Sequence, residues 1–195
     1  MTEIYAKCGQ VEVRAYETRD FKAWLDANTN TLPLQNKFDL PPRPAEHLNE
    51  EFFAQILDAQ KAARALGEQF NLGVFCPDNG TFFGGASLMD IKRGVLFNAI
   101  IGCWFYNQHW GNGYAKDSLD ALIEIAFGQL RLHRIEAGIE PENFRSIRLA
   151  EKTGLRLEGL KKKLLWLRED WRDCLIYAMT SEEKNIVHSG FIKTG

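Results

Sequence analysis

A glycine-rich turn, Gln108-His109-Trp110-Gly111-Asn112-Gly113, constrains the fold of this chain more than any other segment. A strand-like apolar run over residues 95–106 leads into the turn, and a helical pattern over residues 114–130 follows it. Glycine adopts backbone conformations that side chains forbid, and it lets a ligand approach the main chain closely. The free amides at the start of a helix attract anions, with help from the helix dipole. The segment therefore predicts an anion site of the kind that holds a pyrophosphate.

Two better-known phosphate motifs do not fit this turn. A Rossmann fingerprint needs a third glycine and an acidic residue about 20 positions further on, within a βαβ unit. A P-loop needs Gly-Lys-Ser/Thr, which the sequence lacks. A G-x-G turn can also be a tight strand-to-helix corner that binds nothing. The turn alone leaves that alternative open.

Hydrophobic periodicity and turn residues predict an α+β fold, with a mixed central sheet of about seven strands flanked by about four helices. Strands joined by tight turns pair in antiparallel fashion, whereas a strand–helix–strand crossover needs a parallel pair. Four prolines between Thr31 and Pro44 predict a long loop, and Gly84-Gly85 predicts a bulge or a close approach of two strands. The predicted strands cover residues 11–16, 70–76, 81–91, 95–106, 132–139, 155–166 and 171–179, and the later helices cover 47–66, 114–130 and 142–153.

The length of 195 residues and a hydrophobic fraction of 45% are typical of a single domain, here with a core over residues 11–180 and a polar tail over 181–195. A formal net charge of −2 argues against direct nucleic-acid binding. No apolar run is long enough for a membrane helix, and the N-terminus lacks the apolar core of a secretory signal, so we expect a cytoplasmic protein. The four cysteines lie far apart and predict no metal site.

Two further segments add to the glycine turn. Gln108-x-x-Gly111-x-Gly113 resembles the Q/R-x-x-G-x-G/A motif of the GNAT N-acetyltransferases, and the order of predicted elements is that of the same family. The segment from Asn143 to Leu155 resembles the family's N-x-x-S-x-x-x-x-x-K-x-G-F helix, with Leu155 in place of Phe. Trp171-Arg172-Asp173 is similar to the W-R-D of the RimJ/RimL branch, which acetylates the N-termini of ribosomal proteins. The resemblance is specific over residues 102–155.

The resemblance implies that acetyl-coenzyme A is the co-substrate. Its pyrophosphate would bind the glycine turn and its pantetheine arm would pair with the strand Gly102-Cys103-Trp104-Phe105. The residues expected to contact it are Cys103, Trp104, Phe105, Gln108, Trp110, Gly111, Asn112, Gly113, Tyr114, Ala115 and Asn143. Asn143 also fits a helix N-cap, and the two roles are compatible.

The resemblance places Ser146 near the thioester sulfur, where its hydroxyl could protonate the leaving thiolate. The base is less well defined. Glu136 and Glu140 fall on the polar face of the strand over residues 132–139 and just beyond it, where several relatives carry a catalytic glutamate. Both glutamates could equally be solvated. RimL-type enzymes have a glutamate where Leu165 stands here, which favours the RimJ side.

The RimJ/RimL resemblance implies transfer of the acetyl group to a primary amine, namely the N-terminal α-amine of a protein such as a ribosomal protein. Two alternatives stay open: acetylation of a small amine (an amino acid, a polyamine or an aminoglycoside), and a non-catalytic acetyl-coenzyme A-binding module. The loop from Thr31 to Pro44 would wall the acceptor groove. A homodimer is left open.

Overall fold

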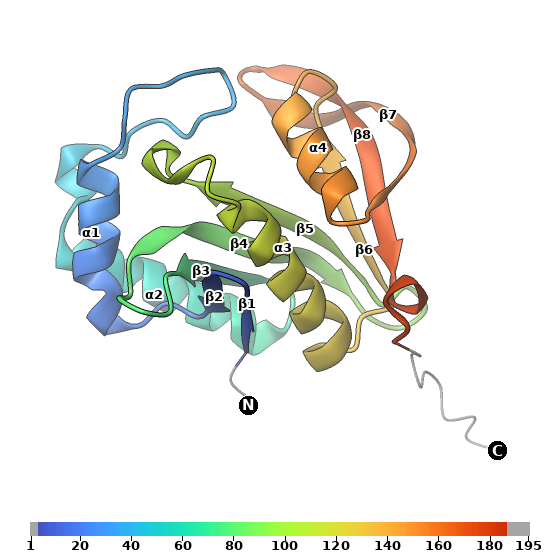
Figure 1. Ribbon diagram of the computed structural model, residues 1–195, viewed down its shortest axis with the longest axis horizontal. Coiled ribbons are helices and arrows are strands. Elements are labelled where there is room, and N and C mark those ends of the chain that lie inside the picture. Colours follow the sequence, from blue (N-terminus) through green and yellow to red (C-terminus); the bar gives the residue numbers. More distant parts are fainter. Residues whose placement is uncertain (1–3, 187–195) are drawn as a thin grey trace.

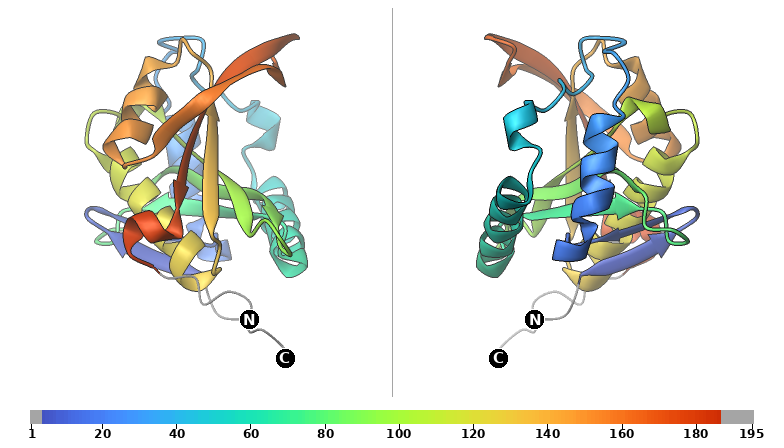
Figure 2. Two further views of the ribbon diagram at one scale, coloured as in Figure 1. Left: turned by 90° about the vertical axis from the view of Figure 1, so that its right-hand side faces the viewer. Right: turned by 90° about the vertical axis from the view of Figure 1, so that its left-hand side faces the viewer.

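The computed structural model describes residues 4–186, which form an eight-stranded mixed sheet with helices on both faces (Figures 1 and 2). The strand order is β1-β2-β3-β4-β5-β6-β8-β7, and β5–β6 is a parallel pair among antiparallel ones. The strands are β1 (Tyr5–Cys8), β2 (Val11–Arg14), β3 (Phe70–Phe75), β4 (Phe82–Lys92), β5 (Asn98–Phe105), β6 (Arg134–Ile139), β7 (Arg156–Leu167) and β8 (Asp170–Thr180). The helices are α1 (Phe21–Thr29), α2 (Glu50–Leu66), α3 (Tyr114–Glu124) and α4 (Phe144–Lys152).

The predicted α+β class and the element order are confirmed, with eight strands in place of about seven. The sequence reading missed β1, a short edge strand in which Ala6 alone is buried. Helix bounds also differ, and α4, predicted over 142–153, covers Phe144–Lys152. Helix α2 begins after Asn49, whose side chain accepts a hydrogen bond from the Phe52 amide at 2.8 Å. Helix α3 ends at Glu124 and continues as a π-helical turn, Ile125–Gln129, so the predicted helix to residue 130 consists of two parts.

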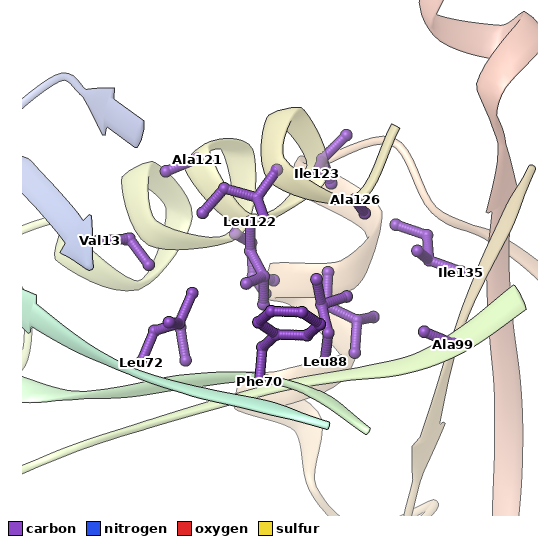
Figure 3. Packing of buried hydrophobic residues seen from close by; sticks show 14 of the residues in the cluster. Val13, Phe70, Leu72, Leu88, Ala99, Ala121, Leu122, Ile123, Ala126 and Ile135 are labelled. Carbon is purple, nitrogen blue, oxygen red and sulfur yellow. The ribbon is translucent and has the colours of Figure 1, made fainter. Parts of the chain in front are cut away.

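The core lies on both sides of the sheet. Helix α3 and the π-helical turn after it pack across one face, where Leu122 and Ala126 are buried against Leu72, Leu88 and other residues of the sheet (Figure 3). A second cluster of buried hydrophobic residues, which includes Trp24, Phe53 and Phe82, joins α1 and α2 to the opposite face of the sheet. These layers fix the start of α3, and with it the glycine turn, against the end of β5.

Gly84 marks the predicted close approach of two strands. A Cβ atom at Gly84 would lie 2.1 Å from the Trp104 carbonyl oxygen of β5, so no side chain fits there. The β3–β4 register shifts beside it, between Val74 and Phe75. This prediction is confirmed, and Gly84 and Gly85 lie opposite the last two residues of β5, Phe105 and Trp104.

The predicted polar tail begins with a short 3-10 helix, Ser181–Lys184, in which Ser181 is buried. Residues 187–195 of that tail lie outside the described residues. Within residues 4–186, no helix combines the length and the apolar character that spanning a bilayer requires.

Candidate active site

Strands β5 and β6 separate at the centre of the sheet. They pair in parallel at Asn98↔Arg134, Ala99↔Ile135 and Ile100↔Glu136, and β5 then runs on to Phe105 without a partner on that side among the described residues. Backbone groups left unpaired at a strand edge can accept an added extended chain. The edge of β5 from residue 101 to residue 105 therefore lacks a strand partner, and it is available to an extended, amide-containing ligand except at the Phe105 carbonyl, which accepts from Trp110 Nε1 at 3.1 Å.

The side chains of β5 alternate between the two faces of the sheet. Cys103 faces Ser118 of α3, and burial raises the pKa of its thiol to about 12, although the hydrogen bond with Ser118 acts in the opposite direction. Trp104 lies on the other face, against Phe82 and Tyr106. Both side chains are thus used in packing, and a ligand at this edge would meet the β5 backbone.

The glycine turn follows β5 through a 3-10 helix, Asn107–His109. Gly111 and Gly113 have φ angles of 85° and 86°, in the left-handed region. A Cβ atom at either position would meet nothing within 4 Å. Conformation, and not lack of space, therefore requires glycine at both positions.

Five consecutive amides at this turn have no acceptor among the described residues. They belong to Gly111, Asn112, Gly113, Tyr114 and Ala115. The Tyr114 ring stacks on Phe83 with centroids 4.0 Å apart, which fixes the first turn of α3 on β4. Free amides at a helix N-terminus have the donor chemistry that phosphate oxygens require.

Gln108 points toward α1. Its Nε2 donates to the Ala27 carbonyl at 2.9 Å, and its Oε1 is buried with no hydrogen-bond partner within residues 4–186. It borders a groove of about 670 Å³ between α1 and the β3–β4 turn. Charged side chains of that groove pair with one another, as Arg14 does with Asp20 at 2.7 Å and Lys22 with Asp26 at 2.8 Å. The Gln108 side chain thus attaches the start of the glycine turn to α1.

Helix α4 lies beside the turn. Asn143 caps α4, and its Oδ1 accepts from the Ser146 amide at 3.2 Å, so the predicted N-cap is present. Ser146 is partly buried in the first turn of the same helix. Between them, the Arg145 guanidinium lies over the Trp110 ring, 3.8 Å from its centroid. This stacking joins the two segments that carried the resemblance.

Arg145 was missed by the sequence reading, although a cation between Asn143 and Ser146 was a visible signal. Asn107 was missed as well. It is buried, its Oδ1 accepts from the Leu32 amide at 2.9 Å, and its Nδ2 donates to the Leu32 and Pro33 carbonyls. Asn107 therefore attaches the root of the 31–44 loop directly to the end of β5.

Glu136 and Glu140 are both bound by arginine. Glu136 lies level with Ile100, where β5 and β6 are still paired, and accepts from Arg134 Nε at 2.8 Å. Glu140 follows the last residue of β6, has a side chain 12% exposed and pairs with Arg168. Of the two, Glu140 lies at the end where the strands have separated.

The 31–44 loop reaches across this open end toward the β7–β8 hairpin (Figure 1). Lys37 pairs with Glu142 in the β6–α4 connection. The Arg168 guanidinium, already bound to Glu140, lies 5.5 Å from the centroid of the Phe38 ring. The loop thus bridges the two halves of the sheet above the separation of β5 and β6.

The sheet opens between two parallel strands, and amides without an acceptor among the described residues lie at the start of the following helix, so this site can accept an extended ligand that carries a phosphate. An acetyltransferase (GNAT) domain model matches residues 10–156, and the chain therefore belongs to the GNAT acetyltransferase family. Within residues 4–186, no group of three or more histidine, cysteine, aspartate or glutamate side chains is arranged to hold a metal ion.

Comparison with individual proteins identifies relatives in several bacteria. The chain is 34% identical over 116 residues to the Bacillus subtilis protein named "Probable N-acetyltransferase YjcK", a match that covers 60% of this chain and 64% of that protein. It is 31% identical over 118 residues to the Escherichia coli [ribosomal protein uS5]-alanine N-acetyltransferase, covering 60% of each. Among solved structures, Mycobacterium smegmatis RimJ in complex with CoA-disulfide superposes with a TM-score of 0.76 at 26% identity, covering 92% of this chain and 88% of that one.

Proposed function

We propose that this protein transfers the acetyl group of acetyl-coenzyme A to a primary amine, and that the acceptor is the N-terminal α-amine of a protein. One observation carries the coenzyme part of the proposal: the unpaired edge of β5 is followed, after one short 3-10 helix, by five amides that lack an acceptor among the described residues. A pantetheine arm carries amides that can pair with a strand edge, and a pyrophosphate suits the helix N-terminus. The two features lie in the order in which coenzyme A carries these groups.

The reaction needs few groups from the protein. The neutral amine attacks the thioester carbonyl, a C–N bond forms, and the C–S bond breaks. Amides of β5 stabilise the oxyanion, and the amine loses one proton while the thiolate gains one. We assign protonation of the thiolate to the Ser146 hydroxyl, which lies in the first turn of α4.

An α-amine acceptor suits a site whose carboxylates are occupied. Glu136 and Glu140 each share their oxygens with an arginine. An α-amine has a pKa near 8, so roughly a tenth of it is neutral at pH 7, against well under about 0.1% of a lysine amine with a pKa of about 10.4. A weakly basic group or a water relay is therefore enough to deprotonate an α-amine, but it is not enough to deprotonate a lysine amine. We assign the proton-accepting end of that relay to Glu140, at the open end of the sheet.

The 31–44 loop supplies the wall of the acceptor groove in this proposal. Its contacts with Glu142 and Arg168 are an exposed ion pair and a cation–π contact, which are individually weak. A polypeptide N-terminus can therefore displace them on entering. By similarity to the uS5-alanine enzyme, we expect a small first residue such as alanine.

Mass spectrometry of one peptide tests the acceptor. The peptide begins with alanine and carries an internal lysine, so that both amines compete. We expect acetylation of the α-amine alone, with release of one thiol per product. A dominant acetyl-lysine product would overturn the α-amine assignment.

The same assay separates the alternatives. Turnover with spermidine, free amino acids or an aminoglycoside but not with peptides would point to a small-amine acceptor. Tight coenzyme A binding without thiol release in any acceptor mixture would make the protein a binding module, since fold does not fix function.

A further inference from the structure

Two side-chain carboxamides, those of Gln10 and Asn112, hold the glycine turn in place. They donate hydrogen bonds to backbone carbonyls of the turn, whereas the backbone amides of the turn are the groups that would meet a ligand. Gln10, in the β1–β2 turn, donates from its Nε2 to the Asn112 carbonyl at 3.2 Å. Asn112 donates from its own Nδ2 to the carbonyls of His109 and Trp110, at 3.1 and 3.3 Å. Three carbonyls within the turn, those of His109, Trp110 and Asn112, are thus fixed by side-chain donors.

In a planar trans peptide, the carbonyl and the following N–H point in opposite directions. The described residues contain no cis peptide bond. Binding of the Trp110 carbonyl by Asn112 therefore turns the Gly111 N–H away from that side chain. Binding of the Asn112 carbonyl by Gln10 turns the Gly113 N–H away from the β1–β2 turn. Both of these N–H groups have no acceptor among the described residues.

The β1–β2 turn is itself fixed on α3, so Gln10 has a defined position. The backbone N–H of Gln10 donates to Oδ2 of Asp117 at 2.9 Å, and Asp117 lies in the first turn of α3. A Cβ atom at Gly9 would lie 2.3 Å from the same oxygen, so this turn packs directly against the helix start. The contact also holds the Asp117 carboxylate against the β1–β2 turn.

We propose that Gln10 and Asn112 are positioning residues for the pyrophosphate-binding amides, each fixing one peptide unit of the glycine turn so that its N–H faces the ligand. The inference rests on the proposed function, in which that turn holds the pyrophosphate of coenzyme A. Free glycine peptides rotate easily, and fixing them before binding removes an entropic cost of association. The role differs from contact with the ligand, because Gln10 acts through the Asn112–Gly113 peptide.

Gln10→Met tests the inference, because methionine keeps the shape of the side chain and removes its hydrogen bonds. Gln69→Met is the matched control, since Gln69 also donates through Nε2, to Asn71 Oδ1 at 3.0 Å, at the start of β3. The dissociation constant of coenzyme A is measured by calorimetry. That of pantetheine, which lacks the pyrophosphate and the nucleotide, is measured by titration of amide resonances.

We expect Gln10→Met to weaken coenzyme A binding about fivefold, to leave pantetheine binding and the melting temperature unchanged, and to alter the Gly113 amide resonance. Gln69→Met should leave all of these unchanged. Gln10→Glu, which accepts where a donor is needed, should weaken coenzyme A binding further.

Three outcomes would overturn parts of this account in distinguishable ways. Unchanged coenzyme A affinity in Gln10→Met, with the wild-type protein still preferring coenzyme A over pantetheine, would overturn the positioning role and leave the proposed pyrophosphate site standing. Equal wild-type affinities for the two compounds would remove the pyrophosphate site itself. Parallel loss of both affinities in Gln10→Met would make Gln10 a general structural residue.

Discussion

The Arg145 guanidinium stacks on the Trp110 indole, with its Cζ 3.8 Å from the ring centroid, and so ties the start of α4 to the glycine turn. The indole Nε1 is fixed in turn by the Phe105 carbonyl at 3.1 Å. A cation is thereby held next to amides that have no acceptor among the described residues. Charge and hydrogen-bond donors converge at one place on the surface, although they come from separate elements.

Arg145→Ala should weaken coenzyme A binding about threefold, because a cation held beside the anion site is lost together with its cation–π contact. The loss should shrink at high salt, since exposed charges are screened. Arg148→Ala, on the same helix and also exposed, is the control and should change little. Calorimetry at two salt concentrations measures both variants, and equal effects would remove the specific role of Arg145.

Gly113→Val should weaken coenzyme A binding at least tenfold, or about 1.4 kcal/mol. A β-branched residue resists a positive φ and would turn the free amides out of line. Gly67→Val is the control, because Gly67 has a φ of 70°, meets nothing within 4 Å of an added Cβ, and lies at the end of α2. Both variants should lose some thermal stability, but Gly67→Val should keep its coenzyme A affinity.

Ser146→Ala should lower kcat about tenfold with little change in acetyl-coenzyme A affinity, if its hydroxyl protonates the thiolate. Ser146→Thr keeps a hydroxyl and should recover much of the rate. Steady-state kinetics with thiol detection decides the matter. An unaltered kcat in Ser146→Ala would reduce the hydroxyl to a packing role. Asn143→Ala, by contrast, should cost stability and coenzyme binding together, because Asn143 caps α4.

Glu158, in β7, should make the stability of the protein sensitive to acid through its ion pair with Arg134 of β6. Arg134, and then Arg156, lower the pKa of its carboxyl from 4.5 to about 2. A carboxyl with a lowered pKa contributes stability that is complete above its unfolded-state pKa and is lost as the pH falls toward the folded-state value. Glu158→Gln should therefore lower the melting temperature at pH 7, and the difference from wild type should shrink between about pH 4.5 and pH 2.

Thermal scans over this pH range test the expectation for Glu158. Glu46→Gln is the control, because Glu46 is exposed and forms no ion pair among the described residues. A melting-temperature difference for Glu158→Gln that stayed constant down to pH 2 would show that the arginine pairing does not contribute to stability.

The parts of the site that depend on neighbouring residues could be predicted from the sequence. Gly111 and Gly113 adopt the positive φ angles that their spacing between a strand and a helix indicated, and Asn143 is the N-cap that its position before α4 suggested. Such features are set by sterics and hydrogen bonds within a few residues. The catalytic roles of Ser146, Glu136 and Glu140 stay predictions.

The contacts that complete the site join residues that are far apart in the chain. Hydrophobic periodicity in the sequence gives no information about such contacts. Gln10 and Asn112 are 102 residues apart, and Lys37 and Glu142 are 105 apart. Strand β1 escaped notice for a related reason. With Ala6 as its one buried residue, it carries almost no alternation, and its pairing with β2 holds it in the sheet.

The short parallel pairing between β5 and β6 has a consequence for the stability of the fold. Strands β1 to β5 and strands β6 to β8 are joined within the sheet at three register positions, and helix packing and the 31–44 loop add further contacts between them. A ligand lying along the free edge of β5 would lie between strands β1–β5 and strands β6–β8 and would hold these two parts of the sheet together. Coenzyme A at 100 times its dissociation constant would then add about 2.7 kcal/mol to the free energy of unfolding. Hydrogen exchange should slow most at the amides of β5 and β6, so that the co-substrate of the reaction would also be a structural member of the fold.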